Sequence, residues 1–425
     1  MIDRMEQTER TTHDGDAGRR GAGRIVAVKT HLVHCAIPAE LRVRSGAGLK
    51  LARQSAFVEI TTDQGLTGIG PCSFGSASLD LAAAASMLDH AIAPILLGED
   101  AGRISYLWDK VYYGSITRVL GPRGIGVALL SGVDIALWDL KGKAAGLPLY
   151  ELLGGVVHDP VKAYASSIYW LPPDDAAAIA RAYVSDGFAA VKMKVGLNYR
   201  NDVASLEAIR GEVGPNVDIM VDANQCYSRH LALKVGRELE KYDVLFFEEP
   251  LPTDDVEGHA FLAERLDVRI ATGENMYTRW DFLPFIERRA IHVVQGDASR
   301  TGGITEARRI FELAAAHHLH AAPHTFSDVL TVAASLHLNA VSPNAILLEL
   351  DRTYNPLMTD LVTNPLSIHD GVVELPTGPG LGVEVDWDFV REHPYGGEHG
   401  IGAGARPAFG LAGEILPDRT AEALS

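Results

Sequence analysis

The sequence predicts an α/β fold: a (β/α) barrel of the TIM type that follows a smaller N-terminal α+β domain. Three observations support this prediction. The 425 residues are enough for two or three domains, or for one large barrel with additions. Residues 24–155 begin with antiparallel strand patterns and continue with helical ones. Residues 156–350 alternate eight short β-branched runs with helical segments, and eight parallel strands close a barrel.

The composition is that of a globular chain, with 47% hydrophobic and 22% charged residues. A net charge of −17 argues against nucleic acid or an anionic membrane as the main partner. Residues 1–23, predicted to be a disordered tail, lack the apolar core of a signal peptide, and no apolar run is long enough to span a membrane. The few scattered cysteines, Cys35, Cys72 and Cys226, favour a cytoplasmic protein without a disulfide framework.

The first domain, residues 24–155, is predicted from a change of periodicity. Residues 25–28 and 56–60 have strand patterns, and the second run ends at the turn residues 63–65. From about residue 76 the period becomes helical, and residues 134–143 form the clearest predicted helix. Strands followed by helices favour a compact α+β module.

The second domain, residues 156–350, is predicted from the regular spacing of its strands. Gly302 and Gly303 precede a predicted helix over residues 304–318 and mark the start of one unit. The predicted strands are residues 161–165, 189–195, 218–222, 244–248, 268–273, 292–295, 319–322 and 346–350.

The remaining residues, 351–425, contain strand and turn patterns and end in a Gly-rich stretch over residues 396–404. We expect this C-terminal segment to pack back on the first domain. We expect its Gly-rich end to be poorly ordered.

Three acidic residues end consecutive strands of the predicted barrel. Asp222, Glu248 and Glu274 follow one another at intervals of 26 residues, which is one β/α unit. Barrel enzymes keep their active sites at this end, so the three carboxylates should converge on the mouth. Carboxylates so close would repel one another without a cation between them, and an all-oxygen ligand set suits Mg²⁺.

Two lysines occupy the second predicted strand. Side chains alternate along a strand, so Lys192 and Lys194 should both point into the barrel. One lysine beside another lowers its pKa, and we expect a neutral amine to be available as a base near pH 7.

On the opposite side, Asp297 ends the sixth strand, His324 the seventh and Glu349 the eighth. A carboxylate bonded to the imidazole fixes its tautomer and raises its basicity, so the Asp297–His324 pair is a second predicted acid/base group. A zinc site at residues 317–320 is disfavoured, because two of its histidines lie at a helix end and no cysteine joins them.

The whole set of site residues resembles the mandelate racemase subgroup of the enolase superfamily, which includes muconate lactonizing enzyme-like proteins. The residues that carry this resemblance are Lys192-x-Lys194, Asp222, Glu248, Glu274, Asp297, His324 and Glu349. Residues 63–70 and 134–155 are similar to the capping domain of that family, and the resemblance covers residues 24–394. It implies a modified barrel of the β7α type with residues 24–155 as its cap.

The resemblance implies that Asp222, Glu248 and Glu274 hold Mg²⁺. Glu249 is next to Glu248, and Asn224 lies two residues beyond Asp222 on the same side of the strand. Both are therefore expected to support the metal ligands.

The implied reaction begins with removal of the proton α to a carboxylate. Lys192 would neutralise that carboxylate, and a protonated Glu349 could donate a hydrogen bond to it. Lys194 and the His324–Asp297 pair would stand on opposite faces of the α-carbon.

The substrate is expected to be a small carboxylate. Four cations, Arg42, Arg44, Lys50 and Arg53, lie in a loop of the first domain and favour a polar, anionic substrate with a second carboxylate. We expect dehydration of an aldonate or aldarate to a 2-keto-3-deoxy acid, by a homo-oligomer. The alternatives are a racemase or epimerase, a sugar-lactone cycloisomerase and, as a different class, a non-catalytic sugar-acid-binding protein.

Overall fold

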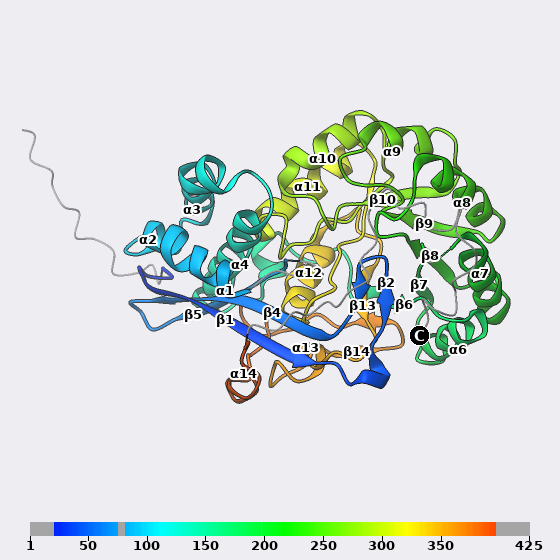
Figure 1. The fold of residues 1–425 in the computed structure, drawn as a ribbon. Helices are drawn as coiled ribbons and strands as arrows, with labels where there is room; N and C mark the ends of the chain where they lie inside the picture. The colour runs from blue at the N-terminus through cyan, green and yellow to red at the C-terminus, as the bar shows by residue number, and fades with distance from the viewer. Residues whose placement is uncertain (1–20, 75–80, 197, 397–425) are drawn as a thin grey trace, which may run out of the picture.

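The computed structural model describes residues 21–74, 81–196 and 198–396. Figure 1 shows an N-terminal cap, drawn in blue and cyan, beside a barrel ringed by helices. Most of the predicted tail of residues 1–23 lies outside the described residues, as does the Gly-rich end from residue 397. Within the part of the chain that the structure describes, no helix is long and apolar enough to cross a membrane.

The cap consists of a three-stranded antiparallel sheet and several helices. The strands β1 (Ile25–Ala36), β4 (Ala52–Thr62) and β5 (Thr67–Cys72) are paired in the order β1-β4-β5. Between β1 and β4, a short helix η1 (Ala39–Leu41) leads into the small hairpin β2 (Arg44–Ser45) and β3 (Gly48–Leu49). The helices of the cap are α1 (Leu81–Met87), η2 (Leu88–Ile92), α2 (Ala93–Leu96), α3 (Ile104–Val111), η3 (Tyr112–Leu120), α4 (Ile125–Ala145) and α5 (Leu149–Leu152).

Helix α4 is the centre of the cap and is longer than the predicted residues 134–143. Its residues 126–137 are all buried, so this half lacks the one-sided periodicity that marks a surface helix. β5 packs so closely against it that a Cβ atom at Gly70 would collide with the backbone oxygen of Gly132. The helix ends at Gly146, which adopts the left-handed conformation that glycine tolerates without strain.

The barrel contains all eight predicted strands, and the predicted fold class is confirmed. Strands β6 to β12 pair in parallel and in chain order, and β13 pairs with β6. A bridge between Ala321 and Ala345 joins β12 to the segment before β13 and closes the ring. The strands are β6 (Val161–Ile168), β7 (Ala190–Lys194), β8 (Asp218–Asp222), β9 (Val244–Glu248), β10 (Arg269–Thr272), β11 (Val293–Val294), β12 (His320–Ala321) and β13 (Leu348–Asp351).

One helix follows each of the first seven barrel strands and lies outside the ring (Figure 1). Several of these helices begin at a side chain that accepts a backbone N–H, as Ser228 does for α8 and Asp328 for α12. The helices are α6 (Pro173–Ser185), α7 (Tyr199–Val213), α8 (Arg229–Lys241), α9 (Val256–Ala263), α10 (Thr278–Glu287), α11 (Gly303–Ala316) and α12 (Val329–Val341).

The C-terminal segment touches both parts of the molecule. Its hairpin of β14 (Ile368–His369) and β15 (Val372–Val373) pairs with β6, and the short α13 (Pro356–Thr359) precedes it. The last helix, α14 (Trp387–Glu392), lies on the cap, where the Trp387 ring is 4.8 Å from the His31 ring. One core cluster contains cap, barrel and C-terminal residues, among them Phe57 and Leu381.

Candidate active site at the mouth of the barrel

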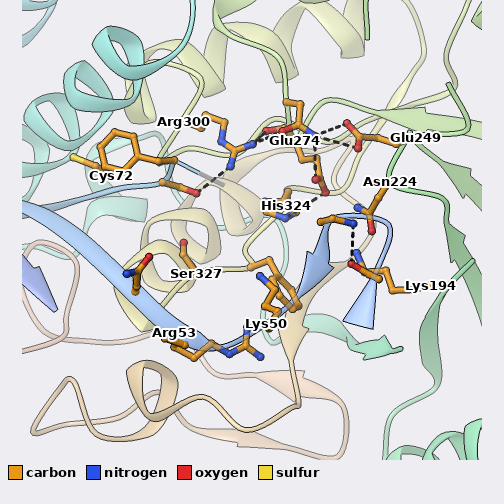
Figure 2. A pocket seen from close by; sticks show the side chains of 18 of the residues that line it. Lys50, Arg53, Cys72, Lys194, Asn224, Glu249, Glu274, Arg300, His324 and Ser327 are labelled. Atoms are coloured by element: carbon orange, nitrogen blue, oxygen red, sulfur yellow. Dashed lines mark hydrogen bonds and ion pairs between the residues drawn. The ribbon is translucent and has the colours of Figure 1, made fainter. Parts of the chain in front are cut away.

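A cavity of about 300 Å³ lies between the cap and the mouth of the barrel. The cap contributes Lys50, Arg53 and Ser73 to its lining, and the barrel contributes Lys194, Glu274 and His324, among others. Figure 2 shows Lys50 and Arg53 on one side of the cavity and Arg300 with Glu274 on the other. The cavity thus encloses the strand ends at which the sequence places its chemistry.

The structure brings the three predicted metal ligands together. Oxygen atoms of Asp222, Glu248 and Glu274 lie within 4.8 Å of one another, and no other such group of acidic, histidine or cysteine side chains occurs among the described residues. Burial and the nearby Asp222 raise the pKa of Glu248, and its Oε1 atom is buried without a hydrogen-bond partner. A hard divalent cation would relieve both penalties, so these residues fit Mg²⁺. His317, His318 and His320 belong to no such cluster.

Both lysines of β7 point into the mouth. The Nζ atom of Lys192 lies 2.7 Å from Glu248 and 2.7 Å from Glu349. Lys194 pairs with Asp222.

The predicted lowering of the Lys194 pKa is wrong in this arrangement. Burial would lower the pKa, but Asp222 raises it above its ordinary value, and this attraction outweighs the repulsion from Lys192. The sequence showed the neighbouring lysine but not the carboxylate that contacts the amine.

His324 and Asp297 form the predicted pair, with 2.9 Å between Nδ1 and Oδ2. The other ring nitrogen, Nε2, lies 3.4 Å from Glu274 and 4.0 Å from Glu349. Burial would lower the pKa of His324, but the carboxylates of Glu274, Glu349 and Asp297 raise it to about 9. The imidazole is therefore cationic near neutral pH and can donate a proton.

Glu349 reaches the mouth but is not protonated, contrary to the role considered for it from the sequence. Burial would raise its pKa, but Lys192, His324 and Lys194 hold the pKa well below its ordinary value. Its Oε2 accepts a hydrogen bond from the backbone N–H of Thr325 at 3.1 Å. Glu349 is therefore an anion that partners the two cationic groups beside it.

Asn224 and Glu249 both lie beside the acidic triplet. The backbone N–H of Asn224 donates to Asp222 at 2.8 Å. Glu249 accepts hydrogen bonds from Asn275 at 2.8 Å and from Gln225 at 3.1 Å. Burial, followed by the charges of Glu274 and Asp222, raises the pKa of Glu249 well above its ordinary value.

Arg300 and Asn275 are candidate functional residues that sequence reasoning missed. Arg300 is 2% exposed and donates to the backbone oxygen of Glu274 at 2.6 Å and to Asn275 at 2.7 Å. Asn275 in turn donates to Glu274 Oε1 at 3.1 Å. Arg300 comes three residues after Asp297, at a strand end that the sequence identified, but only the folded structure reveals its partners.

The same stretch connects the barrel to the cap. The backbone N–H of Ser73, just after β5, donates to the oxygen of Ser299 at 2.9 Å, and Arg300 approaches the Ser73 hydroxyl at 3.4 Å. Ser299 also donates to Asp297 at 2.8 Å through its backbone. Residues 297–300 therefore contact the cap, the His324 pair and a predicted metal ligand.

Of the four loop cations predicted to bind substrate, Lys50 and Arg53 line the cavity, but Arg42 and Arg44 do not. Arg42 is exposed and donates to the oxygen of Ile37 at 3.2 Å. Arg44 belongs to the β2–β3 hairpin, where its backbone oxygen accepts a hydrogen bond from Trp170. The loop turns within a few residues, so only part of its charge faces inward.

Phe326, also missed from the sequence, lies among three cations of the cavity. The centroid of its ring is 5.1 Å from Lys50, 5.3 Å from Arg53 and 5.6 Å from Lys194. An aromatic face attracts cations at such distances. The ring thus lies close to cations of both the cap and the barrel.

Fold and site together define a capped-barrel enzyme of the enolase type. The chain belongs to the mandelate racemase/muconate lactonizing enzyme family of the enolase superfamily. Residues 28–154 match the N-terminal domain of that family, and residues 174–389 match the enolase C-terminal domain-like family.

Characterised relatives catalyse reactions of acid sugars. The chain is 37% identical to the arabinonate dehydratase of Saccharolobus solfataricus over 340 residues, which are 79% of this chain and 89% of that protein. It is 31% identical to the D-galactarolactone cycloisomerase of Agrobacterium fabrum over 383 residues, which are 87% and 98% of the two chains. The chain is therefore an enzyme of a group that contains acid-sugar dehydratases and a cycloisomerase.

Solved structures agree closely with this fold. A protein from Bordetella bronchiseptica RB50, provisionally assigned as a mandelate racemase and complexed with 2-oxoglutarate/phosphate, is 51% identical, with a TM-score of 0.83. The match covers 89% of this chain and all of that one. A racemase from Streptomyces coelicolor A3(2) with bound magnesium is 30% identical, with a TM-score of 0.79 over 87% of this chain and all of that one.

Proposed function

We propose that this enzyme uses Mg²⁺ to remove the proton α to a carboxylate and then eliminates water. The substrate is an aldonate or aldarate, and the product is a 2-keto-3-deoxy acid. The observation that carries the proposal is the acidic triplet, whose member Glu274 lines the same cavity as the two acid/base groups Lys194 and His324. The dehydratase relatives and the relative complexed with 2-oxoglutarate/phosphate support a small carboxylate substrate.

Asp222, Glu248 and Glu274 would hold the metal. Bound there, Mg²⁺ would supply positive charge for the developing anion, and its charge beside Asp222 would lower the pKa of Lys194. Lys192 would neutralise the substrate carboxylate, and Asn275 and Asn224 would keep the metal ligands oriented through their hydrogen bonds.

Lys194 would then take the α-proton, and His324 would act as the acid. The raised pKa of His324 keeps its imidazole protonated, which suits a group that must deliver a proton to the departing β-hydroxyl. The hydroxyl leaves as water, and the resulting enol tautomerises to the 2-keto acid. Asp297 holds the imidazole in place throughout.

A cycloisomerase is the second candidate, because the D-galactarolactone cycloisomerase relative matches across 98% of its own length. It would need the same proton removal, but the bond between the β-carbon and the lactone ring oxygen would break, so that the ring opens to a carboxylate and no water leaves. A racemase or epimerase would return the proton on the opposite face. A non-catalytic binding protein is disfavoured, because every acid/base group and metal ligand named above is present in the cavity region.

The test is to supply a library of mono- and dicarboxylate sugar acids and their lactones with Mg²⁺ in deuterated water. Formation of a 2-keto acid with loss of one water from an open-chain sugar acid supports dehydration. Deuterium incorporation with inversion at the α-carbon, and no keto acid, would show epimerisation instead of dehydration. A 2-keto acid formed from a lactone by ring opening, without loss of water, would establish the cycloisomerase instead.

A further inference from the structure

We infer that the ring of Phe326 packs against the carbon chain of the substrate beside the reacting carbons, and so determines which sugar-acid chains the cavity accepts. This inference rests on the proposed function, which places the reacting carbons between Lys194 and His324.

Phe326 is an apolar side chain that the protein core does not account for. It is half-buried and lines the cavity, but it belongs to none of the hydrophobic clusters formed by the described residues. Phe74, which also lines the cavity, packs instead against the core of the cap. The Phe326 ring is therefore an apolar part of the cavity wall that contributes little to core packing. Aromatic rings in such places commonly contact the carbon atoms of a ligand.

The ring lies close to both acid/base groups. Its centroid is 5.6 Å from the Nζ atom of Lys194 and 6.3 Å from the centroid of the His324 ring. Non-bonded atoms touch at roughly 3.5 Å, so one carbon atom in contact with two groups can bridge about 7 Å between them. Both separations are shorter than this. A carbon held between Lys194 and His324 can therefore contact the Phe326 ring at the same time.

The segment that carries the ring is held on both sides. The backbone N–H of Thr325 donates to Glu349 at 3.1 Å, and the side-chain amide of Asn355 donates to the backbone oxygen of Ser327 at 3.1 Å. These bonds fix the backbone before and after Phe326. A wall that is fixed in advance discriminates better between ligand shapes, because less ordering is needed on binding.

The chemistry of a phenyl ring sets the kind of chain that it favours. A hydroxyl group that points at the ring would give up its hydrogen bond to water without gaining a comparable one, whereas a C–H group loses nothing. Epimers that differ in which of these groups faces the ring should therefore differ in affinity by at least ~5-fold. The ring thus favours a chain whose hydrogens face it.

The first experiment detects the contact itself with 2-oxoglutarate, because the relative from Bordetella bronchiseptica was solved in complex with 2-oxoglutarate/phosphate. Isotope-labelled 2-oxoglutarate would be added to Mg²⁺-loaded enzyme and followed by proton–carbon correlation NMR. An aromatic ring shields protons that lie over its face, so the protons on C3, the carbon next to the keto group, should shift upfield on binding. Phe326→Leu should remove this shift and weaken binding about fourfold, the worth of one buried methylene group.

Phe74→Leu is the matched control, because this ring lines the same cavity but packs against the cap core. It should lower the Tm while the C3 protons keep their upfield shift. No upfield shift in the wild type, a shift that persists in Phe326→Leu, or one that is lost equally in Phe74→Leu would overturn the inference. Failure of 2-oxoglutarate to bind the wild type would count against the proposed carboxylate site and so against both proposals. The expected shift in an enzyme that dehydrates no sugar acid would reject only the dehydration.

The second experiment tests selection between chains. D-galactonate, D-gluconate and D-gulonate, which differ only in configuration at C3 and C4, would compete with labelled 2-oxoglutarate in a His324→Asn background that prevents elimination. One of them should bind at least ~5-fold more tightly than another. Phe326→Gln, which can form hydrogen bonds, should narrow this difference, and Phe326→Leu should keep it. Equal affinities of the three acids, or a difference that Phe326→Gln leaves unchanged, would overturn the role in selection.

Discussion

Lys192 illustrates, at the scale of single residues, how this site stabilises charges that burial alone would exclude. Burial would lower its pKa, but Glu248 and Glu349 raise it well above its ordinary value. Lys194 with Asp222, and His324 with Asp297, repeat the arrangement. Removing one member leaves the other buried and uncompensated, so the consequences should be large.

Replacing Glu248 by Gln should weaken metal binding by at least ~10-fold, because an anionic ligand is lost from a set that has only oxygen donors. The measurement is the Mg²⁺-dependent rise in Tm, together with Mn²⁺ binding followed by electron paramagnetic resonance. Glu264→Gln is the control, since Glu264 is 74% exposed. Normal metal affinity in the Glu248 variant would show that another acid is the ligand.

Replacing His324 by Asn should reduce keto-acid formation at least ~10²-fold, because the general acid is lost. If Lys194 is the base, this variant should still exchange the α-proton for solvent deuterium. Lys194→Ala should lose both exchange and product. Exchange that persists without Lys194 would assign proton removal to His324.

Replacing Arg300 by Met should lower metal affinity by about 10-fold, since Glu274 and Asn275 lose the donor that positions them. Arg300→Lys should restore part of the affinity, whereas Arg279→Met should leave it unchanged because Arg279 pairs with Glu306 outside the cavity. Mn²⁺ titration is the measurement. Wild-type metal affinity in the Arg300→Met enzyme would show that the contact of Arg300 with Glu274 and Asn275 does not position the metal ligands.

At the scale of elements, helix α4 is joined to the barrel by a buried acid. Asp134 Oδ2 accepts from the backbone N–H of Thr305 in α11 at 2.9 Å, whereas Oδ1 is buried without a hydrogen-bond partner. Burial raises the pKa of Asp134 to about 7. Burial therefore favours the neutral acid, although the hydrogen bonds from Thr305 favour the anion.

The pH dependence of stability should reveal the burial of this acid. Neutral Asp134 contributes fully below about pH 4, its ordinary pKa, and the contribution is lost as the pH rises through about 7. Asn does not ionise, so Asp134→Asn should lack this pH-dependent loss of stability. The Tm of the wild type minus the Tm of the variant should therefore fall between pH 5 and pH 8. The full difference cannot exceed ~4 kcal/mol. A constant difference in Tm would mean that Asp134 does not titrate in this range.

The sequence predicted those elements and site residues whose pattern is set by residues close together in the chain. Short apolar runs that alternate with helical segments predicted all eight barrel strands, and the residues at the strand ends predicted the acidic triplet and the His324 pair. The extent of α4 was not predicted, because a helix buried on every side has no periodicity to detect. Arg300, Asn275 and Phe326 depend on contacts between distant segments, and the charge state of Glu349 depends on two lysines of β7 and on His324, which follows β12.

At the scale of the whole molecule, the cap and the barrel share a core. Val33 and Phe57 of the cap, Ile219 and Phe247 of the barrel, and Leu381 of the C-terminal segment belong to one buried cluster. Separate unfolding would expose this shared surface in both parts. The two parts should therefore lose structure together.

Calorimetry should accordingly show a single unfolding transition, and Mg²⁺ should raise its Tm without splitting it. The same midpoint should be found by far-ultraviolet circular dichroism and by tryptophan fluorescence. Two separated transitions would show that the shared cluster does not couple the cap to the barrel.

The contact between Ser73 and residues 299–300 limits how this enzyme can be recombined with its relatives. A chimaera that takes its cap from another family member would acquire new loop residues around the substrate. It would also replace the segment against which Arg300 and the Asp297 turn are held. Such a hybrid should keep turnover only if the donor cap ends its third sheet strand with a backbone N–H and a hydroxyl in the place of Ser73, so specificity cannot be exchanged independently of catalysis.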